Sequence, residues 1–305
     1  MAGFIRPVTV LVGVLLGLSA QGKQRESTSQ APSPLHLESH LVLLNVVVTD
    51  SSGRYVQGLR QADFQVYEDG QPRSLTGFGT EETPFAAAIL LDISSSQERM
   101  FRIGRAAARQ FAGGLRSEDL YAVYVFAGKA ARIQEFGNTP ELEEVIWSIK
   151  PSGFTALYDA IALAAQELSQ RPERRRAILV LSDGDDTASG QSLDGALRCA
   201  LDGGVTIYAV DLIDEGTPSS RSTMARNALR HMTNKAGGRY IADPGGSQMH
   251  KAFKEIVEEL AQQYTLAYAP HADRHDGRWR KVEVKLTRSG LAARTRQGYY
   301  GPKPR

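Results

Sequence analysis

The sequence predicts an α/β fold: a doubly wound, mostly parallel, Rossmann-like sheet inserted in a β-sandwich that is formed from the N- and C-terminal flanks. Between residues 84 and 262, short apolar runs alternate with amphipathic segments of helical period, which is typical of strands and helices around a parallel sheet. Residues 37–83 and 263–305 instead contain short strand-like runs separated by turn residues. Each flank alone is small for an independent core, so we expect the two to share one sandwich, with two separate hairpin appendages as the alternative.

The N-terminus is typical of a secretory signal peptide, which we assign to residues 1–20. Arg6 precedes an apolar run over residues 8–18, and Ala20 offers a small residue at a cleavage position. The run is short for a membrane span, so we predict a mature chain that is secreted or periplasmic and has no membrane span, with an uncleaved anchor as the alternative. Residues 21–36, rich in Gln, Ser and Pro, are predicted to be a disordered spacer.

Local patterns place the elements in order along the chain. Asp69-Gly70 is a hairpin turn signal, and Thr139-Pro140 combines a helix cap with a proline suited to the first helical turn. The continuous apolar runs at residues 177–182 and 205–211 are typical of parallel strands buried on both faces. Strands are expected over residues 41–49, 64–67, 85–91, 120–126, 131–136, 177–182, 205–211, 239–241, 264–268, 281–287 and 292–297. Helices are expected around residues 100–111, from 139, and over 156–168, 223–236 and 247–262.

The composition argues against two classes of function. A net charge of +2 from 36 basic and 34 acidic residues gives no electrostatic reason to expect nucleic acid as a partner. The single cysteine permits neither an intramolecular disulfide nor a zinc site built from thiolates.

Oxygen-bearing side chains follow several of the predicted strands. Asp92, Ser94 and Ser96 come after the first strand of the α/β block, Thr155 precedes a helix, and Asp183 follows the strand at residues 177–182. Ligands of open α/β sheets bind beyond the carboxyl ends of the strands, so these side chains are expected to meet at one edge. Hydroxyl and carboxylate oxygens suit a hard cation, Mg²⁺ first, with Mn²⁺ or Ca²⁺ as alternatives. Each residue alone is also a good cap or turn residue, but their combination favours a metal site.

This combination resembles the von Willebrand factor type A domain and its metal-ion-dependent adhesion site, over about residues 84–262. Residues 92–96, Asp-Ile-Ser-Ser-Ser, match the D-x-S-x-S motif, while Thr155 and Asp183 match the separate threonine and the second aspartate. The flanking segments LNVVVTD, DFQVYEDG and RQGYY resemble those of a bacterial secreted subgroup of related proteins.

The resemblance also implies roles for these residues. Ser94, Ser96 and in some states Thr155 would contact magnesium directly, and Asp92 and Asp183 would act through water, leaving one position for an acidic group of a partner. Rim positions expected to influence partner choice are Gln97, Glu98, Phe154, Asp185, Asp186 and residues 214–223.

The sequence therefore predicts an extracytoplasmic module that binds a protein ligand through a metal ion, in adhesion or assembly, and that is not an enzyme. The enzyme alternative is a magnesium-dependent phosphohydrolase of the haloacid dehalogenase type. That family needs an acid two residues after the nucleophilic aspartate, where this chain has Ser94. The third alternative is a structural module with a vestigial metal site.

Overall fold

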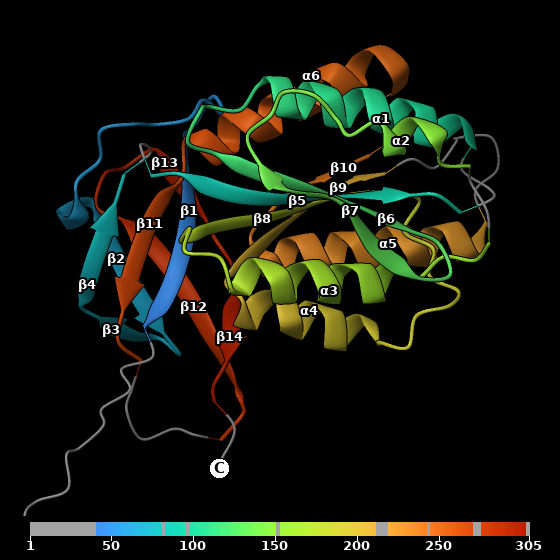
Figure 1. The fold of residues 1–305 in the computed structure, drawn as a ribbon. Helices are drawn as coiled ribbons and strands as arrows, with labels where there is room; N and C mark the ends of the chain where they lie inside the picture. The colour runs from blue at the N-terminus through green and yellow to red at the C-terminus, as the bar shows by residue number, and fades with distance from the viewer. Residues whose placement is uncertain are drawn as a thin grey trace, which may run out of the picture. The chain divides into compact units, whose positions relative to one another are not determined.

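The structure is a computed structural model in which a central sheet covered by helices is joined to a pair of antiparallel sheets (Figure 1). The expected signal peptide and spacer, residues 1–20 and 21–36, lie outside the described residues. The structure describes residues 41–80, 83–94, 98–150, 153–211, 219–242, 245–270 and 276–302.

The central sheet confirms the predicted doubly wound fold. Its strand order is β10-β9-β8-β5-β6-β7, and all neighbouring pairs are parallel except β6 with β7. Every residue of β5 and β9 is buried, which explains why both strands are continuous apolar runs rather than alternating ones. The strands are β5 (Phe85–Asp92), β6 (Leu120–Phe126), β7 (Ala130–Gly137), β8 (Arg175–Ser182), β9 (Val205–Asp211) and β10 (Tyr240–Ile241).

Helices cover both faces of this sheet (Figure 1). Apolar side chains of α1 and α6 pack in the core on one face, and those of α3, α4 and α5 pack in the core on the other. The helices are α1 (Glu98–Gly113), α2 (Val145–Ser148), α3 (Leu157–Ser169), α4 (Leu193–Asp202), α5 (Ser220–Ala236) and α6 (Gly245–Ala261).

One predicted helix start is wrong. The Thr139-Pro140 signal does not open a helix, and the short α2 begins only at Val145. The Tyr121 hydroxyl on β6 donates to the carbonyl oxygens of Thr139 (2.9 Å) and Glu141 (3.2 Å). These contacts hold the segment against the sheet edge as an irregular loop, so tertiary hydrogen bonds replace the helical ones that the local signal favoured.

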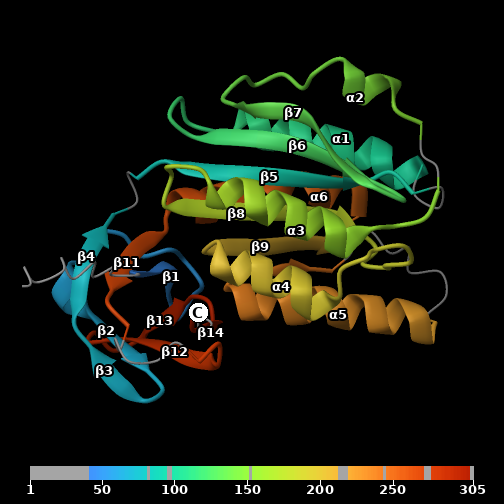
Figure 2. The ribbon, with the colours of Figure 1, turned by 60° about the horizontal axis from the view of Figure 1, so that its bottom comes forward.

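The flanks form the predicted β-sandwich from both ends of the chain. One sheet has the order β13-β1-β11-β4 and the other β14-β12-β2-β3, so each contains strands that precede and strands that follow the α/β block. Residues of both sheets share one apolar core, and Figure 2 shows the two sheets together beside the start of β5. The strands are β1 (Val42–Asp50), β2 (Phe64–Glu68), β3 (Gln71–Arg73), β4 (Leu75–Gly79), β11 (Tyr264–Tyr268), β12 (Trp279–Leu286), β13 (Leu291–Arg294) and β14 (Gly298–Tyr300), with the short 3-10 helix η1 (Gln61–Asp63) before β2.

Turn chemistry and a buried carboxylate organise the sandwich. Asp69 and Gly70 have φ angles of 50° and 80°, which confirms the predicted hairpin between β2 and β3. Glu68 is 2% exposed and accepts hydrogen bonds from the hydroxyls of Tyr268 (3.0 Å) and Tyr299 (2.7 Å). Because Tyr268 lies in the other sheet, this carboxylate links the two layers.

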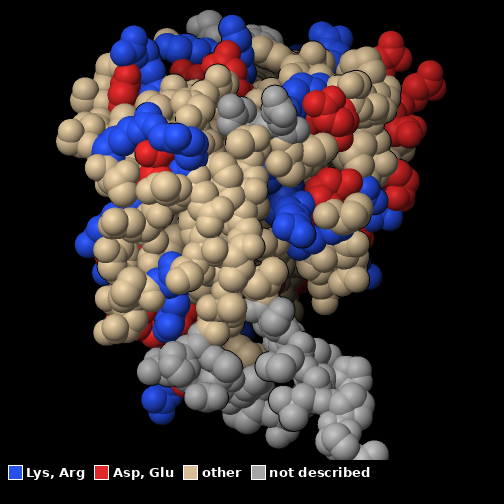
Figure 3. All heavy atoms as spheres, turned by 90° about the vertical axis from the view of Figure 1, so that its left-hand side faces the viewer, with Lys and Arg blue, Asp and Glu red and all other residues tan. Residues whose placement is uncertain are grey.

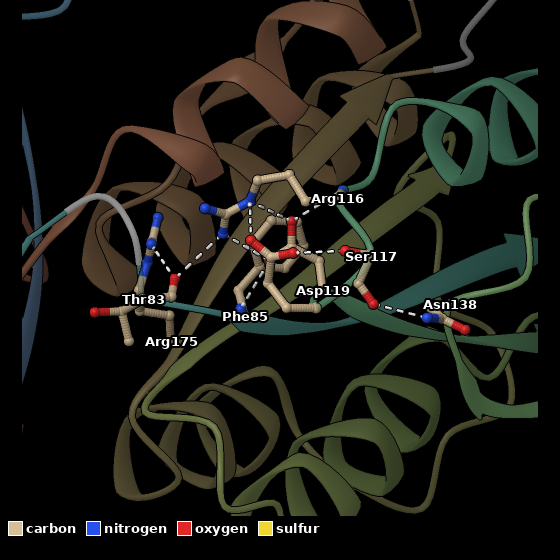
Figure 4. Close-up of polar contacts among 8 residues, drawn as sticks. Thr83, Phe85, Arg116, Ser117, Asp119, Asn138 and Arg175 are labelled. Carbon is tan, nitrogen blue, oxygen red and sulfur yellow. Dashed lines mark hydrogen bonds and ion pairs between the residues drawn. The ribbon is translucent and has the colours of Figure 1, made fainter.

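A polar network fixes the place where the chain enters the central sheet (Figure 4). The carboxylate of Asp119, 1% exposed, accepts hydrogen bonds from the Phe85 amide (3.2 Å) and from Nε and Nη2 of Arg116 (2.9 and 2.8 Å). The Thr83 carbonyl oxygen accepts from Arg116 (3.3 Å) and from Arg175, which is fully buried at the start of β8. The first residues of β5 and β8 are thus fixed at the amino edge of the sheet, opposite the edge where the candidate site lies.

None of the helices within the described ranges combines the length and the apolar character that crossing a membrane requires.

Candidate metal site

The predicted site residues lie at the carboxyl edge of the central sheet. Asp92 is the last residue of β5, and Asp183 directly follows β8. These strands are parallel neighbours in the register Leu91 opposite Leu181, so the two aspartates leave the sheet side by side. In Figure 1 this edge lies at the ends of the β5 and β8 arrows, away from the antiparallel sheets.

Asp92 is buried and held at both carboxylate oxygens. It is 2% exposed, its Oδ1 accepts from the Ser94 amide (2.9 Å), and its Oδ2 accepts from the Ser182 hydroxyl (2.7 Å). Burial raises the pKa of Asp92, and the hydrogen bonds from the two serines partly offset that rise. Ser94 itself is 3% exposed, so the first two members of the motif are enclosed together. Ser96, the third member, lies outside the described residues.

Thr155 is brought to this edge by backbone hydrogen bonds to the loop that follows Asp183. The Thr155 amide donates to the Thr187 hydroxyl (2.9 Å), and the amides of Thr187 and Ala188 donate to the Thr155 carbonyl oxygen (2.8 and 2.9 Å). Thr155 is 6% exposed and lies two residues before α3. Two of the three predicted loops are therefore joined directly.

Asp183 lies in a tight turn that requires glycine next to it. Its Oδ1 accepts from the Asp185 amide (3.1 Å), and Gly184 has a φ of 78°. A Cβ on Gly184 would lie 2.7 Å from Leu229 Cδ1 and 2.8 Å from the Ala225 carbonyl oxygen, so α5 packs closely under the turn.

The charges around Asp183 are predominantly negative. The pKa of Asp183 is raised to about 6, first by burial and then by the carboxylates of Asp92, Asp185 and Asp211, against the opposing hydrogen bond from the Asp185 amide. The buried carboxylate of Asp92 and the partly buried carboxylate of Asp183, at adjacent strand ends, form an acidic cluster whose charge a bound cation would offset.

Several residues of this edge were not predicted as site residues. Ser182 orients Asp92, while Asp211, fully buried at the end of β9, accepts hydrogen bonds from the Tyr240 hydroxyl and from Arg226 Nε (3.1 Å). Asp211 pairs with Ser182 in the register of β8 and β9. The same pattern that identified Asp92, an acid ending an apolar strand, would have found Asp211.

The donor set fits a hard cation by its chemistry. Asp92, Ser94, Thr155 and Asp183 supply only carboxylate and hydroxyl oxygens, the ligand type that Mg²⁺ prefers. Within the described ranges, no three His, Cys, Asp or Glu side chains form a group that could hold a metal ion. A site here would accordingly depend on its hydroxyl groups as well as on its two carboxylates.

Comparison with known proteins agrees with the fold of the central sheet. Residues 87–185 match the family model of the von Willebrand factor type A domain. The structure of a von Willebrand factor type A protein from Catenulispora acidiphila aligns with a TM-score of 0.51 and 11% identity, covering 88% of this chain and 76% of that one. BatB, a conserved hypothetical protein from Bacteroides thetaiotaomicron, aligns with a TM-score of 0.47 and 20% identity over 58% of this chain and 98% of its own. The pilus adhesin SpaC from Lactobacillus rhamnosus GG, in an open conformation, aligns with a TM-score of 0.49 and 11% identity, covering 84% of this chain and 49% of that one. No curated protein matches the sequence significantly.

Proposed function

Because residues 87–185 match the family model of the von Willebrand factor type A domain, we propose that this chain is a metal-dependent protein-binding module. Its site would be the carboxyl edge of the central sheet, where Asp92, Ser94, Ser96, Thr155 and Asp183 hold Mg²⁺. The partner would be a protein that presents an acidic side chain.

The observation that carries this proposal is the meeting of Asp92 and Asp183 at one edge, both partly or fully shielded from solvent. Ser94 is hydrogen-bonded to Asp92, and Thr155 is hydrogen-bonded to the loop that follows Asp183. The Asp92 carboxylate raises the pKa of Asp183, so the two negative charges repel each other unless a cation or protons compensate them. Mg²⁺, when bound, would supply a positive charge to which a carboxylate oxygen of the partner can bind. The role of the chain is to fix these oxygens through Ser182 and the Thr155 loop.

The charges on one face of the molecule and the net charge do not favour nucleic acid as a partner. Figure 3 shows the face of the molecule formed by the antiparallel sheets: Lys and Arg are interspersed with Asp and Glu around a broad uncharged area. No continuous basic surface is visible on that face. With the net charge of +2, this arrangement offers little attraction for a polyanion.

We place the module outside the cytoplasm, secreted or periplasmic, on the evidence of its N-terminal sequence. A binding role without turnover is favoured over a phosphohydrolase because Ser94 occupies the position where that reaction needs a second acid. Both oxygens of Asp92 are also engaged by hydrogen bonds, which suits a positioned ligand better than a free nucleophile.

Isothermal titration with MgCl₂ tests the proposal. We expect saturable binding to the wild-type chain and none to Asp92→Ala or Asp183→Ala. The matched control is Asp194→Ala, which removes an exposed acid of α4 and should bind magnesium as the wild type does. Unchanged magnesium binding by both site variants would show that the proposal is wrong.

A further inference from the structure

Large apolar side chains are exposed next to two segments of the candidate metal site, one beside Thr155 and one on the helix that packs under the Asp183 turn. Phe154 is 71% exposed and Met224 is 73% exposed. Among the described residues, the other exposed large apolar side chains, Leu41, Val145 and Trp147, are between 46% and 47% exposed. A single exposed apolar residue needs no explanation, but two attached to segments of the same candidate site indicate a binding surface.

The backbone fixes the position of Phe154. It lies between Gly153, which has a φ of 83°, and Thr155, which is hydrogen-bonded through its amide to the Thr187 hydroxyl. The carbonyl oxygen of Thr155 accepts two further amides from the same loop. A side chain held in solvent by such a constrained loop loses little backbone freedom when a partner covers it.

Met224 is tied to the Asp183 turn through α5. It lies near the beginning of α5, whose capping box between Ser219 and Ser222 orders the first turn. The next residue, Ala225, is buried, and its carbonyl oxygen would be 2.8 Å from a Cβ on Gly184. Met224 is therefore attached to the helix that supports the Asp183 turn.

Acidic residues that follow the Asp183 turn limit what can bind near these two side chains. Asp185 and Asp186 follow the Asp183 turn and are only partly buried. They would repel additional acids of a ligand, so a run of acidic residues is disfavoured next to the one carboxylate that the metal accepts.

We propose that the partner segment carries a single Asp or Glu flanked by large apolar residues, which contact Phe154 and Met224 while the acid binds at the metal. This inference rests on the proposed function and specifies its ligand class. The metal site would supply the requirement for an acid, and the two apolar side chains would select its neighbours. Removing either side chain to alanine should weaken binding roughly ten-fold, the effect of leaving one large apolar contact unmade.

Selection from a phage-displayed library of random peptides tests both the metal-dependent binding of an acid and the preference for apolar neighbours. The library is selected on the wild-type chain in magnesium and in chelator, and in parallel on the double variant Phe154→Ala/Met224→Ala. The matched control is Leu41→Ala, which removes an exposed apolar side chain at the start of the β-sandwich. Isothermal titration with magnesium alone establishes that each variant retains its metal site.

The expected result is a set of magnesium-dependent peptides with one acid beside Leu, Ile, Phe, Met or Trp. On the double variant the acid should persist and the apolar preference should disappear, while the control should select the same peptides as the wild type. Acidic peptides without an apolar preference, or with the same preference on the double variant, would overturn the inference and leave the proposed function intact. Selection that shows neither acid nor magnesium dependence would overturn both.

Discussion

Replacing Asp183 by asparagine removes one negative charge from the buried acidic cluster and should stabilise the metal-free protein. The pKa of this carboxyl rises from 3.8 to about 6, first because of burial and then because of the neighbouring carboxylates of Asp92, Asp185 and Asp211. The unfolded chain therefore releases this proton at lower pH than the folded protein does. Stability is lost as the pH rises from about 3.8 to about 6, and the loss persists above that range.

The size of the effect follows from the pKa difference. A rise from 3.8 to about 6, at about 1.36 kcal/mol per pKa unit, corresponds to up to about 3 kcal/mol of lost stability at neutral pH. Asparagine keeps an oxygen that accepts the Asp185 amide, so the turn is retained. Asp183→Asn should therefore raise Tm by roughly 5–10 °C at about pH 8 and leave it unchanged near pH 3.5.

Calorimetry in chelator at the two pH values measures this change, with Asp194→Asn on α4 as the control for an exposed acid. The wild type should also gain stability from added MgCl₂, and Asp183→Asn should not, because it has lost a metal-binding carboxylate. A variant no more stable than the wild type at pH 8, or equally stabilised at both pH values, would refute the reasoning.

Three further substitutions test the framework of the fold, each by urea unfolding. Glu259→Ala should cost about 3–5 kcal/mol, because Glu259 is 1% exposed and its loss leaves the Arg294 guanidinium, 2.5 Å away, without its carboxylate. Glu68→Ala should cost about 2–4 kcal/mol, because two buried tyrosine hydroxyls and an arginine lose their acceptor; a cost below 1 kcal/mol would contradict this. Gly238→Ala should cost more than about 3 kcal/mol, because its Cβ would be 1.9 Å from the Ile207 carbonyl oxygen; a wild-type midpoint would mean that the backbone there can move.

The parts of the site that could be predicted from the sequence are those that depend on position along a strand. Asp92 and Asp183 end or directly follow apolar runs, and parallel pairing of β5 with β8 brings such ends together whatever the detailed packing. Asp211 obeys the same rule and was missed only because no matching motif drew attention to it. The helix expected at Thr139 could not be corrected from local sequence, since its competitor is the hydroxyl of Tyr121 on another strand.

The role of the C-terminal flank could not be predicted from the sequence, because it depends on contacts between distant segments. Residues 296–300 resemble a flanking segment of related proteins, but their role depends on helices far earlier in the chain. Arg296 Nη1 donates to the Leu201 carbonyl oxygen at the end of α4 (2.8 Å), and the Gln297 amide donates to that of Lys235 near the end of α5 (3.1 Å). Helix C-termini have carbonyl groups without partners in the helix, and cations are favourable there.

The C-terminal flank thus fixes the ends of α4 and α5 that lie away from the candidate site. The C-terminal flank also holds the end of α5, because Arg294 Nη1 on β13 donates to the Gly237 carbonyl oxygen (2.5 Å). The other end of α5 supports the turn at Gly184. A shift of the sandwich relative to this helix would therefore change the position of Met224 and of the Asp183 turn together. The flanking strands therefore help to position the site. Truncating the chain after residue 262 should lower stability and weaken magnesium binding. Titration of the shortened chain with MgCl₂ would measure the loss of affinity. Magnesium affinity equal to that of the full chain would show that the central sheet positions its site without the sandwich.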